Sequence, residues 1–576
     1  MRKIQYNIIG VLCALLGFSS CSDFLEVEPQ NLIVLDQFWN EKADVEAIIN
    51  GCYSRLQSED CVKRMIVWGE VRGDNVSTGI DTYKDYSLQN ALKENIDASN
   101  GYTDWTCFYT VINNCNTVIK YAPGVAERDL SYTESDLKAT IAEASALRDL
   151  CYFYLIRTFR DVPFTTEAYT DDDQTMDLPA TKFDDLLDFL ISDLESVKGD
   201  AVKRYPDAQK TYQTARITQD AINAMLCEMY LWKQDYQKCI DYADLVIASK
   251  TEQANNSKSS STTKQVDTER TNGFPLIGDG SNSTIFGYSY APLFYTGNSN
   301  EGIFELTYTG KASEDKNTKS NTAVSQFYGN AKAVTGFLAP SQVVLGTAAT
   351  LFKKRDARQY EACNTSKESI AKFVVKNVVL DAASASDAPK PTYSGIWTDG
   401  LTKANWIVYR LTDIMLLKAE ALAGLMVDDA DDKDGSLKAR NKPYYDQAFN
   451  LVNAVNKRSV CRKSYPTDFL AEDTLDMETN RSREKLYELV LEERQRELLF
   501  EGKRWYDLVR MARREGNSAN LAKLASKKQS GGGTMAANRL QKMDAIYWPY
   551  NINELKVNAN LVQNPAFGSG ENDSYK

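Results

Sequence analysis

The stretch LEERQRELLFEGKRWYDLVR, from Leu491 to Arg510, brings two helical patterns together at Gly502. Apolar residues recur at helical spacing before the glycine, and they recur again at i, i+3, i+4 and i+7 after it. The apolar positions are Leu486, Leu489, Val490, Leu498, Leu499 and Phe500 on the first side, and Trp505, Leu508, Val509 and Ala512 on the second. The pattern predicts a hairpin of two helices joined by a tight turn.

Charged residues interrupt the apolar face of the first predicted helix. The stripe through Val490 continues into Glu493, Arg496 and Glu497 before it reaches Phe500. Buried charges must be paired with one another or hydrogen-bonded. The hairpin therefore either contains an internal network of ion pairs or exposes an ordinary solvated helix face.

The same stretch resembles the C-terminal hallmark of the SusD/RagB family, surface lipoproteins of glycan-uptake systems. In that family the pattern R-x-R-E-L-x-F-E-G-x-R-W-x-D-L-x-R recurs. The matching positions are Arg494, Arg496, Glu497, Leu498, Phe500, Glu501, Gly502, Arg504, Trp505, Asp507, Leu508 and Arg510. The resemblance implies that the hairpin holds a helical-repeat scaffold together and is not a ligand site.

Residues 1–20 have the organisation of an export signal. Arg2 and Lys3 precede an apolar run over 8–18, which is too short to span a bilayer. The string FSSC at 18–21 resembles a lipobox, which predicts that the signal peptide is cleaved before Cys21 and that Cys21 is lipidated. An ordinary secretory signal followed by a stray thiol is the alternative.

The segment directly after Cys21 is acidic: Ser22 is followed by Asp23 and Glu26. They resemble the sequence that directs Bacteroidota-type lipoproteins to the cell surface. Several acyl chains on one cysteine give stable attachment, because one chain alone binds a membrane reversibly. We therefore expect a protein anchored by lipid in the outer membrane, on the cell surface.

The composition limits the ligands that the protein can bind and the catalytic mechanisms that it can use. The formal net charge of −12 argues against nucleic acid or an anionic lipid surface as partner, since both select basic patches. The chain has no histidine, which excludes Ser-His-Asp and Cys-His catalysis and histidine metal sites. A glycosidase that uses two carboxylates stays possible, because Asp and Glu number 79.

Eleven cysteines give no disulfide framework and no zinc site. Cys13 belongs to the predicted signal and Cys21 to the lipid anchor, which leaves an odd number without a C-x-x-C spacing. We expect most of the others to be small buried apolar residues.

Helical periodicity predicts a repeat scaffold over about 36–250 and 405–515. The predicted helices are Asp36–Leu56, Trp105–Tyr121, Ile141–Phe159, Thr218–Trp232 with a partner through Ile247, and Ile407–Leu425 with a partner through Val455. The pair that starts at Thr218 resembles a tetratricopeptide unit. Residues 147–164 resemble the first repeat region of the SusD family, with Arg160 where glycine is usual.

The rest of the chain is predicted to be irregular. A loop-rich ligand-binding region is expected over about 65–100 and 250–400, with Val67–Tyr86 as a long loop and short strands at Ile285–Tyr295 and Gly302–Tyr308. The tail over 516–576 contains, from Trp548, a segment that resembles the closing segments of the family. The predicted fold is one mainly α unit over 21–576: a tetratricopeptide-like superhelix with a large loop-rich second region.

An acidic run before Gly435 raises the question of a calcium site. Hard oxygen ligands cluster in this way, but placing Gly435 at the sixth position of an EF-hand loop puts Ala430 at the first and Asn441 at the twelfth. The run is therefore interpreted as a solvated acidic turn, and no metal or other cofactor is predicted.

Sugar recognition needs aromatic faces for the apolar sides of the rings and polar groups for the hydroxyls. In the SusD family the sugar site is built mainly from loops outside the repeats, and loops rich in such residues occupy similar regions here. By this placement the candidate ligand-binding residues are Arg72, Asp74, Asn75, Tyr83, Tyr86, Tyr288, Tyr290, Tyr295, Tyr393 and Trp397. Packing within the core is the alternative role for each tyrosine.

The resemblance implies a function without catalysis. We expect a surface glycan-binding lipoprotein that captures oligosaccharide or polysaccharide and delivers it to a SusC-like TonB-dependent outer-membrane transporter. A carboxylate-dependent glycosidase and a surface scaffold that binds peptide or protein are the alternatives.

Overall fold

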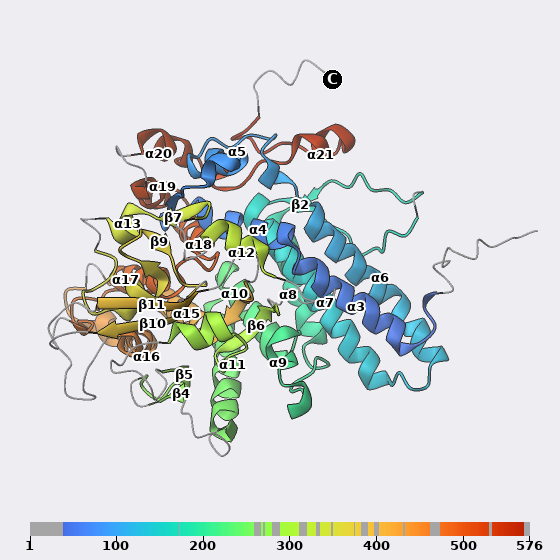
Figure 1. Cartoon of the computed structure of the whole chain (residues 1–576), viewed down its shortest axis with the longest axis horizontal. Coiled ribbons are helices and arrows are strands. Elements are labelled where there is room, and N and C mark those ends of the chain that lie inside the picture. The colour runs from blue at the N-terminus through green and yellow to red at the C-terminus, as the bar shows by residue number, and fades with distance from the viewer. Residues whose placement is uncertain are drawn as a thin grey trace, which may run out of the picture.

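Paired helices form most of the computed structural model (Figure 1). The structure describes residues 38–171, 173–257, 266–268, 271–278, 289–309, 320–329, 335–346, 350–373, 375–381, 390–396, 402–429, 432–460, 473–528 and 533–568. The mainly α fold class predicted from the sequence is confirmed.

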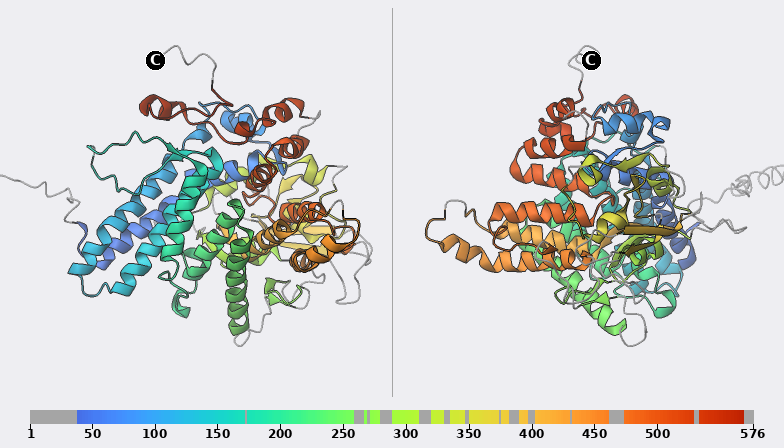
Figure 2. Two further views of the ribbon diagram at one scale, coloured as in Figure 1. Left: turned by 180° about the vertical axis from the view of Figure 1, so that it is seen from behind. Right: turned by 60° about the vertical axis from the view of Figure 1, so that its left-hand side comes forward.

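The helices pack one against the next in a continuous row. In chain order the row contains α3 (Lys42–Leu56), α6 (Thr106–Arg128), α7 (Glu134–Phe159), α8 (Phe183–Val197), α10 (Gln219–Trp232), α11 (Tyr236–Ser257), α15 (Leu411–Leu425), α16 (Ser436–Ser459) and α17 (Arg483–Glu497). Figure 2 shows α3, α6 and α7 lying side by side along one flank of the molecule. α18 (Arg504–Glu515) follows α17 and completes the predicted hairpin.

Capping residues fix several of the helix starts. Thr218 caps α10, as predicted, by accepting a hydrogen bond from the backbone N–H of Ala221 at 3.3 Å. The first helix begins later than predicted, at Lys42, because Glu41 and Asp44 form a capping box there. Asp36, the predicted cap, lies outside the described residues.

Two predicted segments have a different structure. Residues 67–71 were expected to be loop but form a π-helix that continues α4 (Glu59–Ile66), and all five of its residues are buried. The strand predicted at Ile285–Tyr295 is wrong over its described part, where Ala291–Thr296 form a second π-helix, and residues 285–288 lie outside the described residues. Segments of five or six residues carry too little periodicity to distinguish a π-helix from a loop or a strand.

The predicted helix from Ile407 starts at Leu411 instead. Residues 406–410 form strand β12 (Trp406–Arg410), which pairs antiparallel with β6 (Gly302–Leu306) at the predicted strand after Gly302. Every residue of both strands is buried. A fully buried strand does not alternate between apolar and polar residues, so the sequence alone does not distinguish it from the first turn of a buried helix.

The remaining strands are short antiparallel pairs. Those in the described residues are β1 (Val76–Thr78) with β7 (Leu338–Pro340), β2 (Val162–Pro163) with β3 (Ala180–Thr181), β4 (Val266–Asp267) with β5 (Leu276–Ile277), β8 (Cys363–Asn364) with β9 (Ser369–Ile370), and β10 (Val375–Asp381) with β11 (Lys390–Ile396). Except for β2 and β3, which lie within the predicted scaffold range, they lie in the predicted loop-rich region together with the short helices α12 (Thr322–Tyr328), α13 (Gln342–Leu345) and α14 (Ala357–Ala362).

The helix after the first repeat region ends on a residue with positive φ. Arg160 takes φ +73° at the C-cap of α7, where the resemblance expects glycine. Its guanidinium donates to Asp544 of the C-terminal segment. An ion pair to the tail therefore accompanies the unfavourable backbone conformation.

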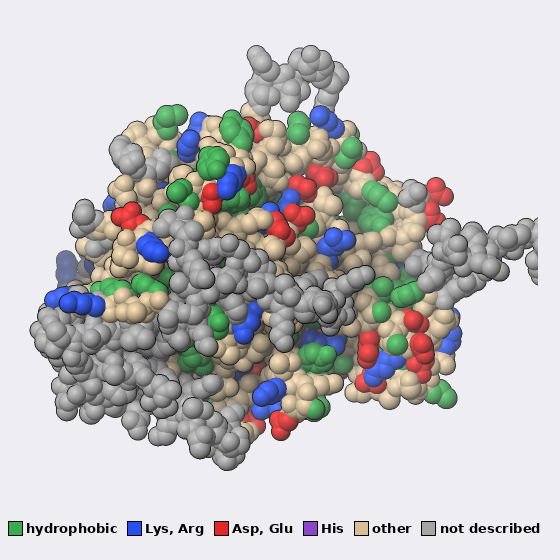
Figure 3. Space-filling model, in the orientation of Figure 1, with side chains coloured by type: hydrophobic (Ala, Val, Ile, Leu, Met, Phe, Trp, Pro, Cys, Tyr) green, Lys and Arg blue, Asp and Glu red, His purple; other side chains and the backbone are tan. Residues whose placement is uncertain are grey.

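Opposite charges alternate over the surface in the orientation of Figure 3, and neither sign dominates the described part of that face. Within the ranges given above, no helix is both long and apolar enough to cross a membrane. The described cysteines are free, and all of them except the half-buried Cys107 are buried, as the sequence predicts.

Two glycines allow the first π-helix to contact the turn of the hairpin. A Cβ atom on Gly69 would lie 1.9 Å from the backbone O of Gly502, and Gly502 itself has φ +69°. The carboxylate of Glu70 accepts hydrogen bonds from the backbone N–H groups of Gly502, at 3.0 Å, and Phe500, at 3.2 Å. The hairpin turn is thus held against a segment more than four hundred residues away in sequence.

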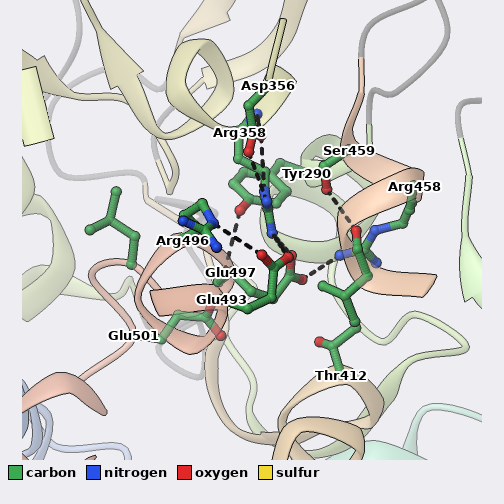
Figure 4. Close-up of polar contacts among 12 residues, drawn as sticks. Tyr290, Asp356, Arg358, Thr412, Arg458, Ser459, Glu493, Arg496, Glu497 and Glu501 are labelled. Atoms are coloured by element: carbon green, nitrogen blue, oxygen red, sulfur yellow. Dashed lines mark hydrogen bonds and ion pairs between the residues drawn. The ribbon is translucent and has the colours of Figure 1, made fainter. Parts of the chain in front are cut away.

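The charged residues of α17 lie in the interior, which excludes the solvated-face interpretation. Glu493 and Glu497 are both inaccessible to solvent, and Figure 4 shows them between arginines that come from other segments. Arg358 reaches both carboxylates, at 2.8 Å and 3.1 Å. Arg496 of the same helix pairs with Glu493 at 3.0 Å.

Arginines from three separate segments meet at Glu497. Arg410, next to α15, donates to Oε1 at 2.7 Å, Arg458 near the end of α16 donates to the same oxygen, and Arg358 donates to Oε2. Burial by itself would raise the pKa of Glu497, but the three guanidinium groups hold it well below its ordinary value. The hairpin therefore acts as the structural element that the resemblance predicts.

Candidate functional site

Two exposed tyrosines lie close together in the chain: Tyr83 on the segment between β1 and α5 (Tyr86–Leu92), and Tyr86 at the first position of α5. The exposed fraction is 71% for Tyr83 and 75% for Tyr86, and Ile80 on the same loop is also exposed. Figures 1 and 2 show α5 at one end of the molecule, beside the C-terminal helices α20 (Thr534–Leu540) and α21 (Ile552–Val557). Exposed aromatic rings offer flat apolar faces to a ligand, so these two predicted residues are available for binding.

The loop is fixed through its backbone to the two residues that precede β7. Gly79 donates its N–H to the carbonyl of Phe337 at 3.0 Å, and Asp81 donates its N–H to the carbonyl of Gly336 at 3.1 Å. A Cβ atom on Gly79 would lie 2.5 Å from the carbonyl oxygen of Gly336, so the close approach needs glycine at position 79. Backbone hydrogen bonds thus hold the loop that leads to the two tyrosines.

Asp85 sets the start of α5 next to Tyr86. Its Oδ1 accepts the N–H of Leu88 at 2.8 Å, and its Oδ2 accepts the hydroxyl of Tyr102 at 2.6 Å. Burial and the neighbouring Asp85 carboxylate raise the pKa of Tyr102, so its hydroxyl keeps its proton and its role as donor. The aspartate therefore connects the exposed loop to the helical body.

Asp74 and Asn75 lie in the interior, and the prediction that they bind ligand is corrected. Both oxygens of Asp74 pair with Arg504 of the hairpin, at 2.7 Å and 3.0 Å. Asn75 donates to Glu70 at 2.7 Å and accepts from Gln495 at 2.8 Å. Their polar groups are occupied by the scaffold, so neither side chain forms a binding surface.

Arg72 is also an interior residue, with an exposed fraction of 1%. Its guanidinium pairs with Glu94 at 2.8 Å, donates to the carbonyls of Ala545 and Ile546 at 2.6 Å and 2.9 Å, and lies 4.4 Å from the ring centroid of Trp505. The predicted direct ligand contact is corrected for Arg72, because all of these donors are used within the protein.

The tyrosines of the middle region are less accessible than those of the first loop. Tyr290 is buried, with its hydroxyl 3.3 Å from the carbonyl of Glu497, so it does not form part of a surface. Tyr393 is half-buried and donates to the carbonyl of Cys363 at 2.7 Å. Tyr295 is half-buried, with the Lys403 ammonium 5.4 Å from its ring centroid. Tyr295 and Tyr393 stay predictions.

Three further predicted residues lie outside the described part of the chain. They are Tyr288, Trp397 and the lipidation site Cys21. The structure does not test them.

The acidic run before Gly435 uses its carboxylates locally. Asp432 accepts the backbone N–H groups of Gly435 and Lys438, at 3.0 Å and 2.8 Å, and Asp429 is buried against Asn441. Ala430 and Asp431 lie outside the described residues. Among the residues that the structure does describe, no cluster of three or more metal-ligating side chains occurs.

A cavity of about 540 Å³ opens where the end of α5 meets the C-terminal segment. Its walls come from residues 94–97 on one side and from 538–545 and 566–568 on the other, with Arg72 at its base. Sequence reasoning missed this site, since no local motif marks two segments that lie more than four hundred residues apart. The polar residues of 538–542, in the predicted C-terminal tail over 516–576, were the available signal.

Two family models match the chain. The SusD family matches residues 300–567. A second family, described as starch-binding and associating with the outer membrane, matches residues 23–231.

One curated relative and two solved structures are similar to this chain over most of its length. SusD-like protein P38 of Formosa agariphila is 25% identical over 522 residues, which cover 87% of this chain and 90% of that protein. A SusD superfamily protein of Bacteroides thetaiotaomicron aligns with a TM-score of 0.61 at 22% identity, covering 92% of this chain and 99% of the other. A laminarin-binding SusD-like protein aligns with a TM-score of 0.58 at 18% identity, covering 92% and 100%.

These matches agree with the hairpin, the row of helix pairs and the closing tail. The chain belongs to the SusD/RagB family.

Proposed function

We propose that this protein is a glycan-binding surface protein, in which Tyr83 and Tyr86 form the aromatic platform that contacts the sugar. The observation that carries the proposal is the exposure of both rings, with Tyr83 on a segment whose backbone is bonded to the residues just before β7 and Tyr86 at the start of α5. A preorganised platform loses little entropy on binding. The laminarin-binding structural relative and the starch-binding family model support a glycan as ligand.

The proposed role is binding without cleavage. A glycosidase needs two carboxyl groups that face the substrate, one of them with a raised pKa. Burial raises the pKa of Glu70 to about 7 and of Glu361 to about 8. Both side chains are buried and accept backbone hydrogen bonds, Glu70 from the hairpin turn and Glu361 from Ser289 and Tyr290. Neither group is placed to reach a sugar.

The proposal includes the cellular context that the family resemblance implies. Lipid on Cys21 anchors the protein in the outer membrane at the cell surface, and a SusC-like TonB-dependent transporter receives the captured glycan. The second family is described as associating with the outer membrane, and this description supports the proposed location. Co-purification of such a transporter from detergent-solubilised membranes tests the partnership.

Affinity electrophoresis through gels that contain polysaccharides of plant, host and microbial origin tests the binding function. We expect retention on at least one glycan, and we expect Tyr83→Ala with Tyr86→Ala to weaken it about ten-fold, because two stacking faces are lost. The melting temperature should stay within a few degrees of the parent value, since both side chains are exposed.

Tyr212→Ala is the matched control, because it removes an exposed tyrosine (40%) that lies outside the platform loop. It should leave retention unchanged. Equal retention of the double variant and the parent would show that the platform is misplaced. Absence of retention on every glycan would favour the peptide-binding or protein-binding scaffold, and new reducing ends in the glycan would identify a glycosidase.

A further inference from the structure

The cavity beyond the end of α5 has a distinct chemistry from the aromatic platform. Its volume of about 540 Å³ lies within the usual range for small-molecule sites. Apolar side chains line part of it, and charged and amide side chains line its rim. The lining residues used below are Arg72, Glu94, Asp97, Asn538, Arg539 and Lys542.

The base of the cavity is an ion pair that is already satisfied. Arg72 and Glu94 neutralise each other at 2.8 Å, and both are buried. Behind them, Lys528 donates its ammonium to the carbonyl of Val71 at 2.6 Å. Burial lowers the pKa of Lys528 to about 8, so it is largely protonated at neutral pH. The base therefore carries one cation more than it has carboxylates.

The rim adds a second excess cation. Arg539 and Lys542 of the α20 region are exposed, and they face one exposed carboxylate, that of Asp97. Asp97 uses Oδ1 to accept the N–H and hydroxyl of Ser99, at 2.7 Å and 2.6 Å. Within the described part of the chain, the structure gives Lys542 no ion pair. Two excess cations gather here on a protein whose formal net charge is −12.

One guanidinium is held in place at the cavity mouth. Arg539 donates through Nη1 to the backbone carbonyl of Glu94 at 2.6 Å. Glu94 has φ +55°, a left-handed conformation that turns the chain at the end of α5. Because one arm of the guanidinium is fixed by this bond, its remaining N–H groups are oriented for a second acceptor. Carboxylate and sulfate groups match such a planar set of donors.

The cavity follows the aromatic platform along one helix. Tyr86 begins α5, and Asn90 and Lys93 lie at i+4 and i+7 on its accessible side. Asn95 at the cavity rim donates to Asn90 at 3.4 Å. Seven residues of helix separate the two sites by about 10 Å. One oligosaccharide chain can therefore contact both.

We propose that this cavity is a subsite for an anionic substituent, a carboxylate or a sulfate ester, on the glycan that the platform holds, with Arg539 and Lys542 as its ligands. The inference rests on the proposed glycan-binding function and narrows its ligand to an acidic polysaccharide. The tyrosines supply contact with the ring faces, and the two cations supply the preference for charge.

Matched pairs of polymers test the subsite with the full mature chain. We expect polygalacturonate to be retained about ten-fold more strongly than its methyl ester, or a sulfated galactan about ten-fold more strongly than the desulfated galactan. The pair that shows the difference identifies carboxylate or sulfate as the group that binds. Raising the salt concentration should reduce the difference, because both cations are exposed.

Arg539→Gln with Lys542→Gln should remove this difference and leave retention of neutral glycan unchanged. Lys542→Gln alone should remove part of the difference in retention. The single variant therefore tests the subsite if the double variant is unstable. Arg440→Gln with Lys442→Gln removes the same two charges from the exposed side of α16 and serves as the matched control.

Different retention results would overturn the anionic subsite and the proposed glycan-binding function. Equal retention of charged and neutral polymers, or full retention of the charged polymer by the double variant, overturns the anionic subsite. If none of the four polymers is retained while another neutral glycan is, the subsite is overturned and glycan binding stands. Absence of retention on any glycan overturns both.

Discussion

Glu497 joins segments that the sequence keeps far apart. Its carboxylate receives Arg358, Arg410 and Arg458, which lie in or beside α14, α15 and α16. The carboxylate is inaccessible to solvent, so the charged groups of the cluster have lost their hydration and are stabilised by the ion pairs among them. Such a cluster is stable only while it is complete, because removal of one partner leaves the rest buried and uncompensated.

Glu497→Gln should therefore lower the free energy of unfolding by about 3–5 kcal/mol. The amide keeps the size of the side chain and removes the one carboxylate that all three guanidinium groups share. Their other carboxylate partners are Asp356, Glu493, Glu501 and Glu301. The midpoint of urea unfolding, followed by circular dichroism, measures the loss. Glu488→Gln makes the same chemical change on the exposed face of α17, where Glu488 pairs with Lys485, and should change stability by less than about 0.5 kcal/mol. Equal effects of the two substitutions would contradict the structural role of the network.

At the same scale, the candidate site shows what composition can and cannot predict. The first loop was identified because it is rich in aromatic and polar residues, and its exposed tyrosines were among those named. Asp74 was named with them but pairs with Arg504 at 2.7 Å. The direction in which a loop side chain points depends on a partner from another part of the chain, and one sequence contains no such information.

Elements with strong periodicity were predictable, and short ones were not. α7 and α10 follow the apolar spacing closely, and α10 begins at the predicted cap. The π-helix Val67–Val71 was mistaken for a loop because Gly69 and the neighbouring Gly73 normally indicate turns. Gly69 instead serves a contact in which two backbones approach, at Gly502 of the hairpin. A glycine required by packing and a glycine required by a turn look the same in the sequence.

The loop that presents the tyrosines depends on a similar close contact. Gly79→Ala would place a methyl group 2.5 Å from the carbonyl oxygen of Gly336, so the loop and the segment just before β7 must separate. We expect glycan retention to fall several-fold, because the platform is then less well ordered. Affinity electrophoresis and the unfolding midpoint, measured together, report the effect on the site and on the fold.

Gly51→Ala provides the comparison for that substitution. Gly51 lies within α3, and a Cβ atom there meets nothing within 4 Å. Alanine should stabilise the helix by about 0.5–1 kcal/mol and leave glycan retention unaltered. If Gly79→Ala behaves like Gly51→Ala, the contact with Gly336 does not hold the platform.

Over the whole molecule, the C-terminal segment closes back onto the first repeats. Trp548 donates its backbone N–H to the carbonyl of Thr158 at 2.8 Å, and Ile552 donates to the carbonyl of Ala98 at 2.8 Å. The sequence of this tail resembles the closing segments of the family. It did not indicate the cavity that the tail forms with residues 94–97. Sites made by distant segments need the fold before they become visible.

Attachment to the membrane is the property of the whole molecule that the sequence predicts most directly. Cys21→Ala removes the only thiol at the predicted cleavage site, so acylation is lost and the protein should move from the outer-membrane fraction to the soluble fraction. Cell fractionation with metabolic labelling by a fatty acid measures both changes. Cys13→Ala, within the predicted signal, keeps the acceptor thiol and should leave labelling and location unaltered. Continued labelling of the Cys21→Ala protein would show that another residue is modified. An unlabelled parent protein would favour an ordinary secretory signal.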